Sequence, residues 1–244
     1  MLQLVTTKLP QIPSALRRRL ERGATLQLRR DAPRVILVER GAIATVMSSS
    51  GTPPVVIQVF GPGSCFIDDV SAPELPGYLP AFTVLQTATI VQAPVRSLAE
   101  HMEGSIDMLL RSLRVQGRHL TERLLKLRVR DPLQRVAGGL LYLVDSLGEG
   151  CAISDGTQLG ITQQMLALVT GLARQTANRE LRRLATARLV VLRRGSVCVI
   201  DRAQLERTAM NGALPLPVAM APIRCRLVHP DAPLDCAIVQ LRRA

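Results

Sequence analysis

The chain has 244 residues, a net charge of +12 and 47% hydrophobic residues, but only 2% aromatic residues and no tryptophan. This length accommodates one large or two modest domains with an aliphatic core. The charge favours polyanionic partners, whereas the scarcity of aromatic residues argues against a single-strand binder that stacks bases. No apolar run approaches the ~20 residues that cross a bilayer, and the first ten residues do not resemble a signal peptide. We therefore expect a cytoplasmic protein with no membrane partner.

The residues that usually carry catalysis or bind metals are sparse. The five cysteines, at positions 65, 151, 198, 225 and 236, form no CxxC pair or compact Cys/His cluster. This argues against a metal site and favours reduced, mostly buried thiols. No Ser/His/Asp arrangement or phosphate-binding loop is evident, and only three histidines exist, so the sequence does not predict an enzyme.

Residues 1–97 are predicted to form a short helix and a β domain. The basic run from Ser14 to Arg22 predicts the helix. Short β-rich segments at 35–38, 43–47, 55–60 and 83–91 follow, separated by turn-forming residues at 51–54 and 61–63. Short strands with such punctuation are typical of a small antiparallel barrel or roll.

A long helix is predicted over about 98–129, within a segment 98–130. Its apolar positions recur at alternating spacings of four and three, which is a heptad pattern interrupted by one glycine. Packing against the helix's own domain is one explanation. We favour a two-helix seam between subunits, because the pattern is longer than one small roll needs. The predicted dimer interface consists of Ile106, Leu110, Leu113, Gly117, Leu120, Leu124 and Leu127.

Residues 131–207 are predicted to form a separate domain. Asp131 and Pro132 suit the first positions of a helix that runs over 133–147. Beyond Arg207 the sequence becomes irregular and rich in proline. We treat 208–244 as an extension to which we assign no function, with 236–241 as a candidate strand.

The segment 162–200 has the pattern of a helix-turn-helix followed by a hairpin. A first helix is predicted over 163–169 with Thr162 as its N-cap, and Gly171 falls where the turn needs positive φ. A second helix is predicted over 174–187, with Ala177, Leu181 and Leu184 on one buried stripe. The hairpin is centred on residues 193–196.

The polar residues of this segment match the chemistry of double-stranded DNA. Arginine can bind guanine O6 and N7, and glutamine or asparagine can bind adenine. Seven arginines lie between 174 and 194, where Glu180 is the only acidic residue, and such a surface suits phosphates. An arginine-rich helix can also be merely solvated, but the turn glycine and the hairpin favour DNA. The predicted DNA-binding residues are Thr162, Gln163, Arg174, Gln175, Asn178, Arg179, Arg183 and Arg194.

From Asp155 to Asp201 the sequence resembles the C-terminal domain of the Crp/Fnr family of bacterial transcription regulators. The resemblance implies that Arg174, Gln175 and Arg179 occupy the family's base-contacting positions, and that Thr162 and Gln163 contact phosphate. Gln175 stands where the family usually has Glu. Ala173 replaces the usual Ser, so the second helix is expected to lack a side-chain N-cap. The segment 60–66 is similar to a turn in the family's cyclic-nucleotide-binding-type roll.

The family's cyclic-nucleotide site is not predicted here. The resemblance would require an arginine to neutralise the buried phosphate, yet no Lys or Arg lies between Arg40 and Arg96. Burying a phosphate without a cation is costly, so neither cAMP nor cGMP is expected, and no cofactor is predicted. Haem on His101 or His119, and thiol redox sensing at Cys65 or Cys198, remain as weaker alternatives.

The sequence thus predicts an α+β protein with an N-terminal antiparallel β-roll, a long dimerisation helix and a C-terminal winged helix-turn-helix domain. The predicted function is that of a homodimeric transcription regulator on palindromic DNA, with RNA polymerase as a partner implied by the resemblance. The alternative is a nonspecific architectural DNA-binding protein.

Overall fold

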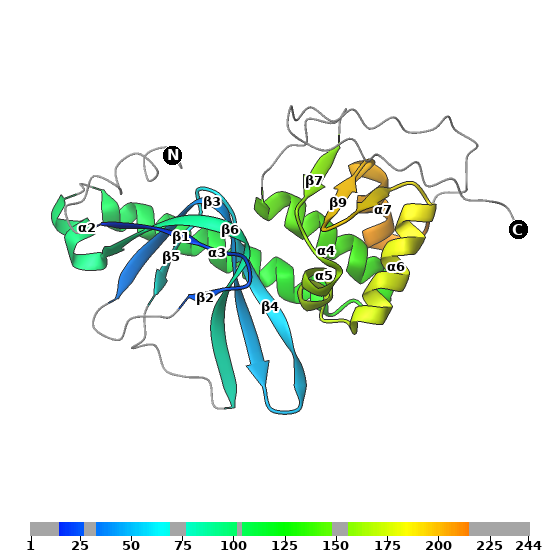
Figure 1. Cartoon of the computed structure of the whole chain (residues 1–244), viewed down its shortest axis with the longest axis horizontal. Coiled ribbons are helices and arrows are strands. Elements are labelled where there is room, and N and C mark those ends of the chain that lie inside the picture. The colour runs from blue at the N-terminus through cyan, green and yellow to red at the C-terminus, as the bar shows by residue number, and fades with distance from the viewer. Residues whose placement is uncertain (1–14, 27–32, 69–76, 102–103, 148–155, 215–244) are drawn as a thin grey trace, which may run out of the picture.

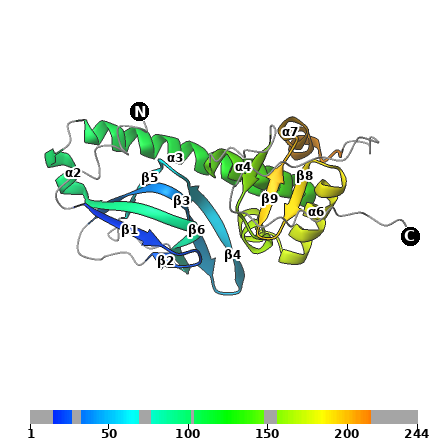
Figure 2. The same ribbon diagram turned by 45° about the horizontal axis from the view of Figure 1, so that its top comes forward.

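The computed structural model describes residues 15–26, 33–68, 77–101, 104–147 and 156–214, which form two lobes (Figure 1). The N-terminal lobe is a β-roll. The C-terminal lobe contains helices and a small sheet, and two helices connect the lobes along one side (Figure 2). The predicted α+β fold class is confirmed, including the order of roll, helix and helix-turn-helix domain.

The roll is an antiparallel sheet organised around two long strands, β3 and β6, that pair along most of their length. β3 also pairs with β4 and β5, and β6 also pairs with β1 and β2. The predicted strands at 35–38 and 43–47 are one strand, because register irregularities near Arg40 carry the pairing past Gly41. The strands are β1 (Leu16–Leu20), β2 (Thr25–Leu26), β3 (Arg34–Ser49), β4 (Thr52–Phe60), β5 (Cys65–Asp68) and β6 (Tyr78–Pro94).

The helix predicted from Ser14 to Arg22 is wrong for the described part of that segment. Leu16–Leu20 is strand β1, which pairs with β6 from Leu16 opposite Gln92 to Leu20 opposite Ala88. Arg17 binds Glu39 of β3, with 2.7 Å between nitrogen and oxygen. The free edge of β6 offers a ladder of hydrogen bonds, and such tertiary context overrides the weak helix preference of a short arginine-rich run.

The turn predicted at 51–54 is shorter than expected. The chain reverses at Ser50 and Gly51, and β4 already begins at Thr52. Pro53 and Pro54 therefore both lie in a strand. β4 is at one end of the strand order, and an edge strand tolerates proline because not every backbone N–H must pair.

Gly41 combines a positive φ with a crowded position in the roll. Its φ is +76°, and a Cβ at this position would lie 2.2 Å from the carbonyl oxygen of Thr87. Gly51 has a similar φ of +82° but open space around it. We expect Gly51→Ala to cost about 1–2 kcal/mol from backbone strain. Gly41→Ala should cost about 1–3 kcal/mol more from overpacking. Chemical denaturation of the two variants measures this difference, and equal losses would contradict the predicted clash.

The long helix predicted over 98–129 is two helices, so a single continuous helix is wrong. α2 spans Val95–His101 and α3 spans Ser105–Leu127. Gly104, just before α3, has a φ of +73°, a conformation that does not continue an α-helix. One face of α3 packs on the roll, where Ser112 and Gln116 both donate to the carbonyl oxygen of Cys65.

Arg123 joins α3 to both lobes. Its side chain is 2% exposed, and Nη2 donates to the carbonyl of Val56 in β4 over 3.2 Å. The guanidinium lies 5.1 Å from the ring centre of Tyr142, whose hydroxyl accepts from the backbone N–H of Val59. Burial lowers the pKa of Arg123 to about 10, which leaves it charged at neutral pH. A buried cation therefore connects the roll, α3 and the C-terminal lobe.

The first helix of the C-terminal lobe has its predicted N-cap. The Asp131 side chain accepts from the backbone N–H of Gln134 at the start of the first helix. The three strands pair in the order β7-β9-β8. The last helix continues to Asn211, beyond the predicted change at Arg207, and the candidate strand 236–241 lies outside the described residues. The elements are α4 (Pro132–Leu147), β7 (Thr157–Leu159), α5 (Gln163–Thr170), α6 (Arg174–Thr186), β8 (Val190–Arg193), β9 (Ser196–Val199) and α7 (Arg202–Asn211).

Candidate nucleic-acid interface

The α5–turn–α6 unit has the local structure that its sequence predicts. The Thr162 hydroxyl accepts from the backbone N–H of Met165 over 3.2 Å and caps α5. Gly171 follows α5 with φ +61°, a left-handed conformation that glycine adopts without strain. Ala167 of α5 and Ala177 of α6 are both buried. Their small side chains allow the two helices to approach closely.

α6 buries one stripe and exposes the other face. Ala177, Leu181 and Leu184 are 1% exposed or less, as the helical period predicts. Ala173 makes no side-chain hydrogen bond to the start of the helix, which confirms the expected missing cap. Backbone N–H groups in the first turn of a helix lack intrahelical partners, and they favour negative charge.

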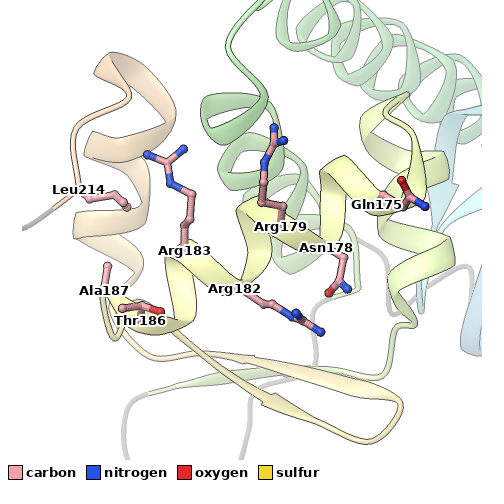
Figure 3. Close-up of a pocket in the computed structure, with 8 residues that line it drawn as sticks. All are labelled: Gln175, Asn178, Arg179, Arg182, Arg183, Thr186, Ala187 and Leu214. Atoms are coloured by element: carbon pink, nitrogen blue, oxygen red, sulfur yellow. The ribbon is translucent and has the colours of Figure 1, made fainter. Parts of the chain in front are cut away.

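Figure 3 shows the exposed face of α6 and the groove beside it. Arg179 and Arg183 point to one side of the helix, whereas Asn178 and Arg182 point to the other. The helix therefore presents polar side chains along both sides of its exposed ridge. The groove is lined by Gln175, Asn178, Arg179, Arg182, Arg183, Thr186, Ala187 and Leu214.

A second groove runs between the start of α5 and the β8–β9 hairpin. Its lining brings together residues that the sequence places far apart, from the cap of α5, the start of α6 and the hairpin tip. The hairpin is the predicted wing, and Gly195 at its turn has φ +75°. This groove contains three of the predicted phosphate contacts, because Thr162, Gln163 and Arg194 line it together with Arg174 and Arg193.

Glu180 lies in α6, and its role was not predicted from the sequence. Its side chain is 3% exposed. Oε1 accepts from Nε of Arg179 at 2.8 Å, and Oε2 accepts from Nη1 of Arg183 at 2.6 Å. The spacing in the sequence indicated this arrangement, because position 180 lies three residues after buried Ala177 and three before Arg183. Burial raises the pKa of Glu180, but the hydrogen bonds from both arginines outweigh burial and hold it below its usual value.

Other kinds of site receive no support from the described residues. In the ranges given above, no group of three or more His, Cys, Asp or Glu side chains could hold a metal ion. Over the same ranges, no helix combines the length and apolar character that crossing a membrane requires.

The comparisons with known proteins agree with this architecture. Residues 134–208 match the model of the Crp-like helix-turn-helix domain. No curated protein matches the sequence. TTHB099, a CRP-family transcriptional regulator from Thermus thermophilus, is similar in structure with a TM-score of 0.66 and 22% identity, over 81% of this chain and 98% of that one. FixK2 from Bradyrhizobium japonicum has a TM-score of 0.65 and 19% identity, over 84% and 99%.

A third similar structure is CLP from Xanthomonas campestris, described as a global regulator that responds to c-di-GMP. Its TM-score is 0.60 with 19% identity, over 81% of this chain and 99% of that one. The resemblance stated from the sequence is confirmed. The segment 134–208 belongs to the Crp-like helix-turn-helix domains, which bind DNA, and the chain has the fold of the Crp/Fnr transcription regulators.

Proposed function

We propose that this protein is a homodimeric transcription regulator that recognises a palindromic DNA site without a cyclic nucleotide. The observation that carries the proposal is the shared location of the predicted DNA-binding residues. They line two grooves, one along the exposed face of α6 and one between α5 and the wing. In a helix-turn-helix protein the second helix enters the major groove, and here that helix is α6.

The side chains divide into base readers and phosphate binders. Arg174 and Arg179 would read guanines, and Gln175 would add a contact to adenine or to the backbone. Asn178 needs to reorient for a base contact through its amide oxygen, because that atom is shielded and without a hydrogen-bond partner in the described structure. Phosphates would be held by Thr162, Gln163, Arg183 and Arg194, which lie around the two grooves.

The exposed leucines of α3 support dimerisation. Leu110, Leu113 and Leu124 are 52%, 46% and 53% exposed in the single chain. A Cβ at Gly117 would meet no atom within 4 Å, so this position also leaves room for a neighbour. Leu120 and Leu127 are half-buried in the single chain. Apolar side chains at these spacings would be buried by a second α3 helix. For Ile106 the structure describes the helical backbone but not the side chain.

The absence of any Lys or Arg between 40 and 96 supports independence from cAMP and cGMP. The alternative effectors receive weaker support. Burial raises the pKa of the Cys65 thiol, which reduces the thiolate that redox reactions require. Cys198 is also buried. His119 is exposed on α3, and the side chain of His101 lies outside the described residues. We also propose that the protein is cytoplasmic and not an enzyme and, from its resemblance to the Crp/Fnr family, that it acts on RNA polymerase.

Selection from a random duplex library tests the function. We expect the purified protein to enrich an inverted repeat with guanine in each half-site and half-sites about one helical turn apart. Parallel selections with and without cAMP should enrich the same site. Strong, salt-sensitive binding without enrichment would favour the architectural alternative. Enrichment only with cAMP would overturn independence from the nucleotide.

A further inference from the structure

Glu180 occupies an unusual position for a carboxylate in a basic DNA-binding helix. Its side chain is 3% exposed, whereas those of its partners Arg179 and Arg183 are 67% and 52% exposed. The carboxylate therefore lies beneath two solvent-facing guanidinium groups. A buried carboxylate without partners would be strongly destabilising. Once one arginine has moved away from Glu180, moving the second arginine away therefore costs more free energy.

The geometry divides the nitrogen atoms of Arg179 between protein and solvent. Nε donates to Glu180 Oε1 at 2.8 Å, and neither terminal nitrogen is needed for that bond. The two terminal nitrogens are the pair that can bind guanine O6 and N7 end-on. Arg183 uses one terminal nitrogen for Glu180 at 2.6 Å. Its other nitrogens can contact a phosphate.

We infer that Glu180 is a positioning residue for DNA recognition, which fixes Arg179 for end-on reading of guanine and aligns Arg183 with the adjacent phosphate. This inference rests on the proposed function. An unrestrained arginine must lose its side-chain freedom on binding. In this helix the carboxylate orders the arginine before DNA arrives. Because Glu180 is buried, it acts only through the two arginines and makes no DNA contact itself.

Glu180 also restricts nonspecific attraction. Its negative charge lowers the net positive charge of the helix that faces DNA by one. Nonspecific binding depends on the number of cations in the protein, because each cation that neutralises a phosphate releases counterions. The pKa of Glu180 lies below its usual value, since the arginine hydrogen bonds outweigh burial. The carboxylate therefore remains charged at neutral pH, and acidification would break the arrangement only below the ordinary carboxyl range. A neutral substitution at pH 7 is thus the practical way to remove it.

The test compares Glu180→Gln with Glu206→Gln. Glu206 pairs with Arg202 on α7 at 3.0 Å, so the control makes the same change in net charge at an ion pair outside both grooves. The quantity measured is the ratio of affinities for the selected site and for the same site with its guanines replaced. We expect Glu180→Gln to lower this ratio by roughly 2- to 12-fold, the cost of ordering one arginine. The control should leave the ratio unchanged.

Three further measurements make the outcome decisive. In an Arg179→Ala background, Glu180→Gln should cause no additional loss of the ratio, because the guanine-reading residue that it positions is gone and the phosphate contact of Arg183 affects both sites equally. Glu180→Asp keeps the charge but shortens the side chain, and it provides the test if Glu180→Gln does not fold. An unchanged ratio in folded Glu180→Gln or Glu180→Asp would overturn the inference. If the wild type has no preferred site, the proposed function fails instead. If Arg179→Ala leaves the preference intact, Arg179 does not read guanine and the inference fails, whereas the proposed function still stands on the selected site.

Discussion

Replacing Leu113 and Leu124 together by Glu should dissociate the proposed dimer into monomers and abolish tight binding to the proposed palindromic site. Both leucines are about half exposed on α3, so the substitutions leave the fold of the single chain intact. In the proposed dimer they would bury two carboxylates against the partner helix. Linking two half-site contacts in one dimer raises affinity by roughly 10²–10⁴, and we expect a loss of that size. Analytical ultracentrifugation and titration with the selected site measure both effects.

The control for this prediction uses the same helix. Val115 and Leu125 are 54% and 61% exposed, and their positions lie off the heptad pattern. Replacing both by Glu adds the same charges to another face of α3 and should leave the dimer intact. Dissociation by this control pair would mean that the seam lies on a different face of α3 than proposed.

Replacing Arg179 by Ala should remove guanine preference at one position of each half-site. We expect specific binding to weaken by roughly 1–3 kcal/mol while nonspecific binding changes little. The fold should persist, because Arg183 still binds the buried carboxylate of Glu180 at 2.6 Å. Fluorescence anisotropy on the selected site, on single-base variants and on random duplex gives the required affinities.

Arg207→Ala on α7 is the matched control for Arg179→Ala. Arg207 is exposed and donates a hydrogen bond to the side chain of Gln204. Replacing Arg207 by Ala therefore removes one positive charge outside both grooves. The control should leave the preference for guanine unchanged. An equal loss on selected and random DNA for Arg179→Ala would assign Arg179 to phosphate contact instead of base reading.

The sequence predicted those parts of the fold that local patterns determine. The helix-turn-helix was predictable because Thr162, Gly171 and the stripe from Ala177 to Leu184 each satisfy a local requirement. The β-roll was predictable because apolar segments alternate with turn residues, although the segments 35–38 and 43–47 belong to one long strand. The wing was predictable from its arginine-glycine turn between two apolar runs.

The errors occurred where long-range contacts decide the structure. Residues 16–20 form a strand because β6 offers a free edge, which no local pattern indicates. The break at Gly104 is a local feature, and it was missed because Gly104 precedes Ile106, the first position of the heptad pattern. Glu180 was counted as one acid among arginines, since its burial depends on how α6 packs in the lobe. The DNA-contact and dimer residues remain predictions.

The buried Arg123 constrains how the two lobes can move relative to each other. Rotating the C-terminal lobe away from β4 would separate the guanidinium from Val56 or from Tyr142, and an uncompensated buried charge costs several kcal/mol. α4, which carries Tyr142, can reorient only at that cost, or after Arg123 reaches water. The backbone between Leu127 and Asp131, where α3 has ended and α4 has not begun, is therefore the natural pivot. An effector that acts on the roll must supply this free energy before it can change the orientation of α6.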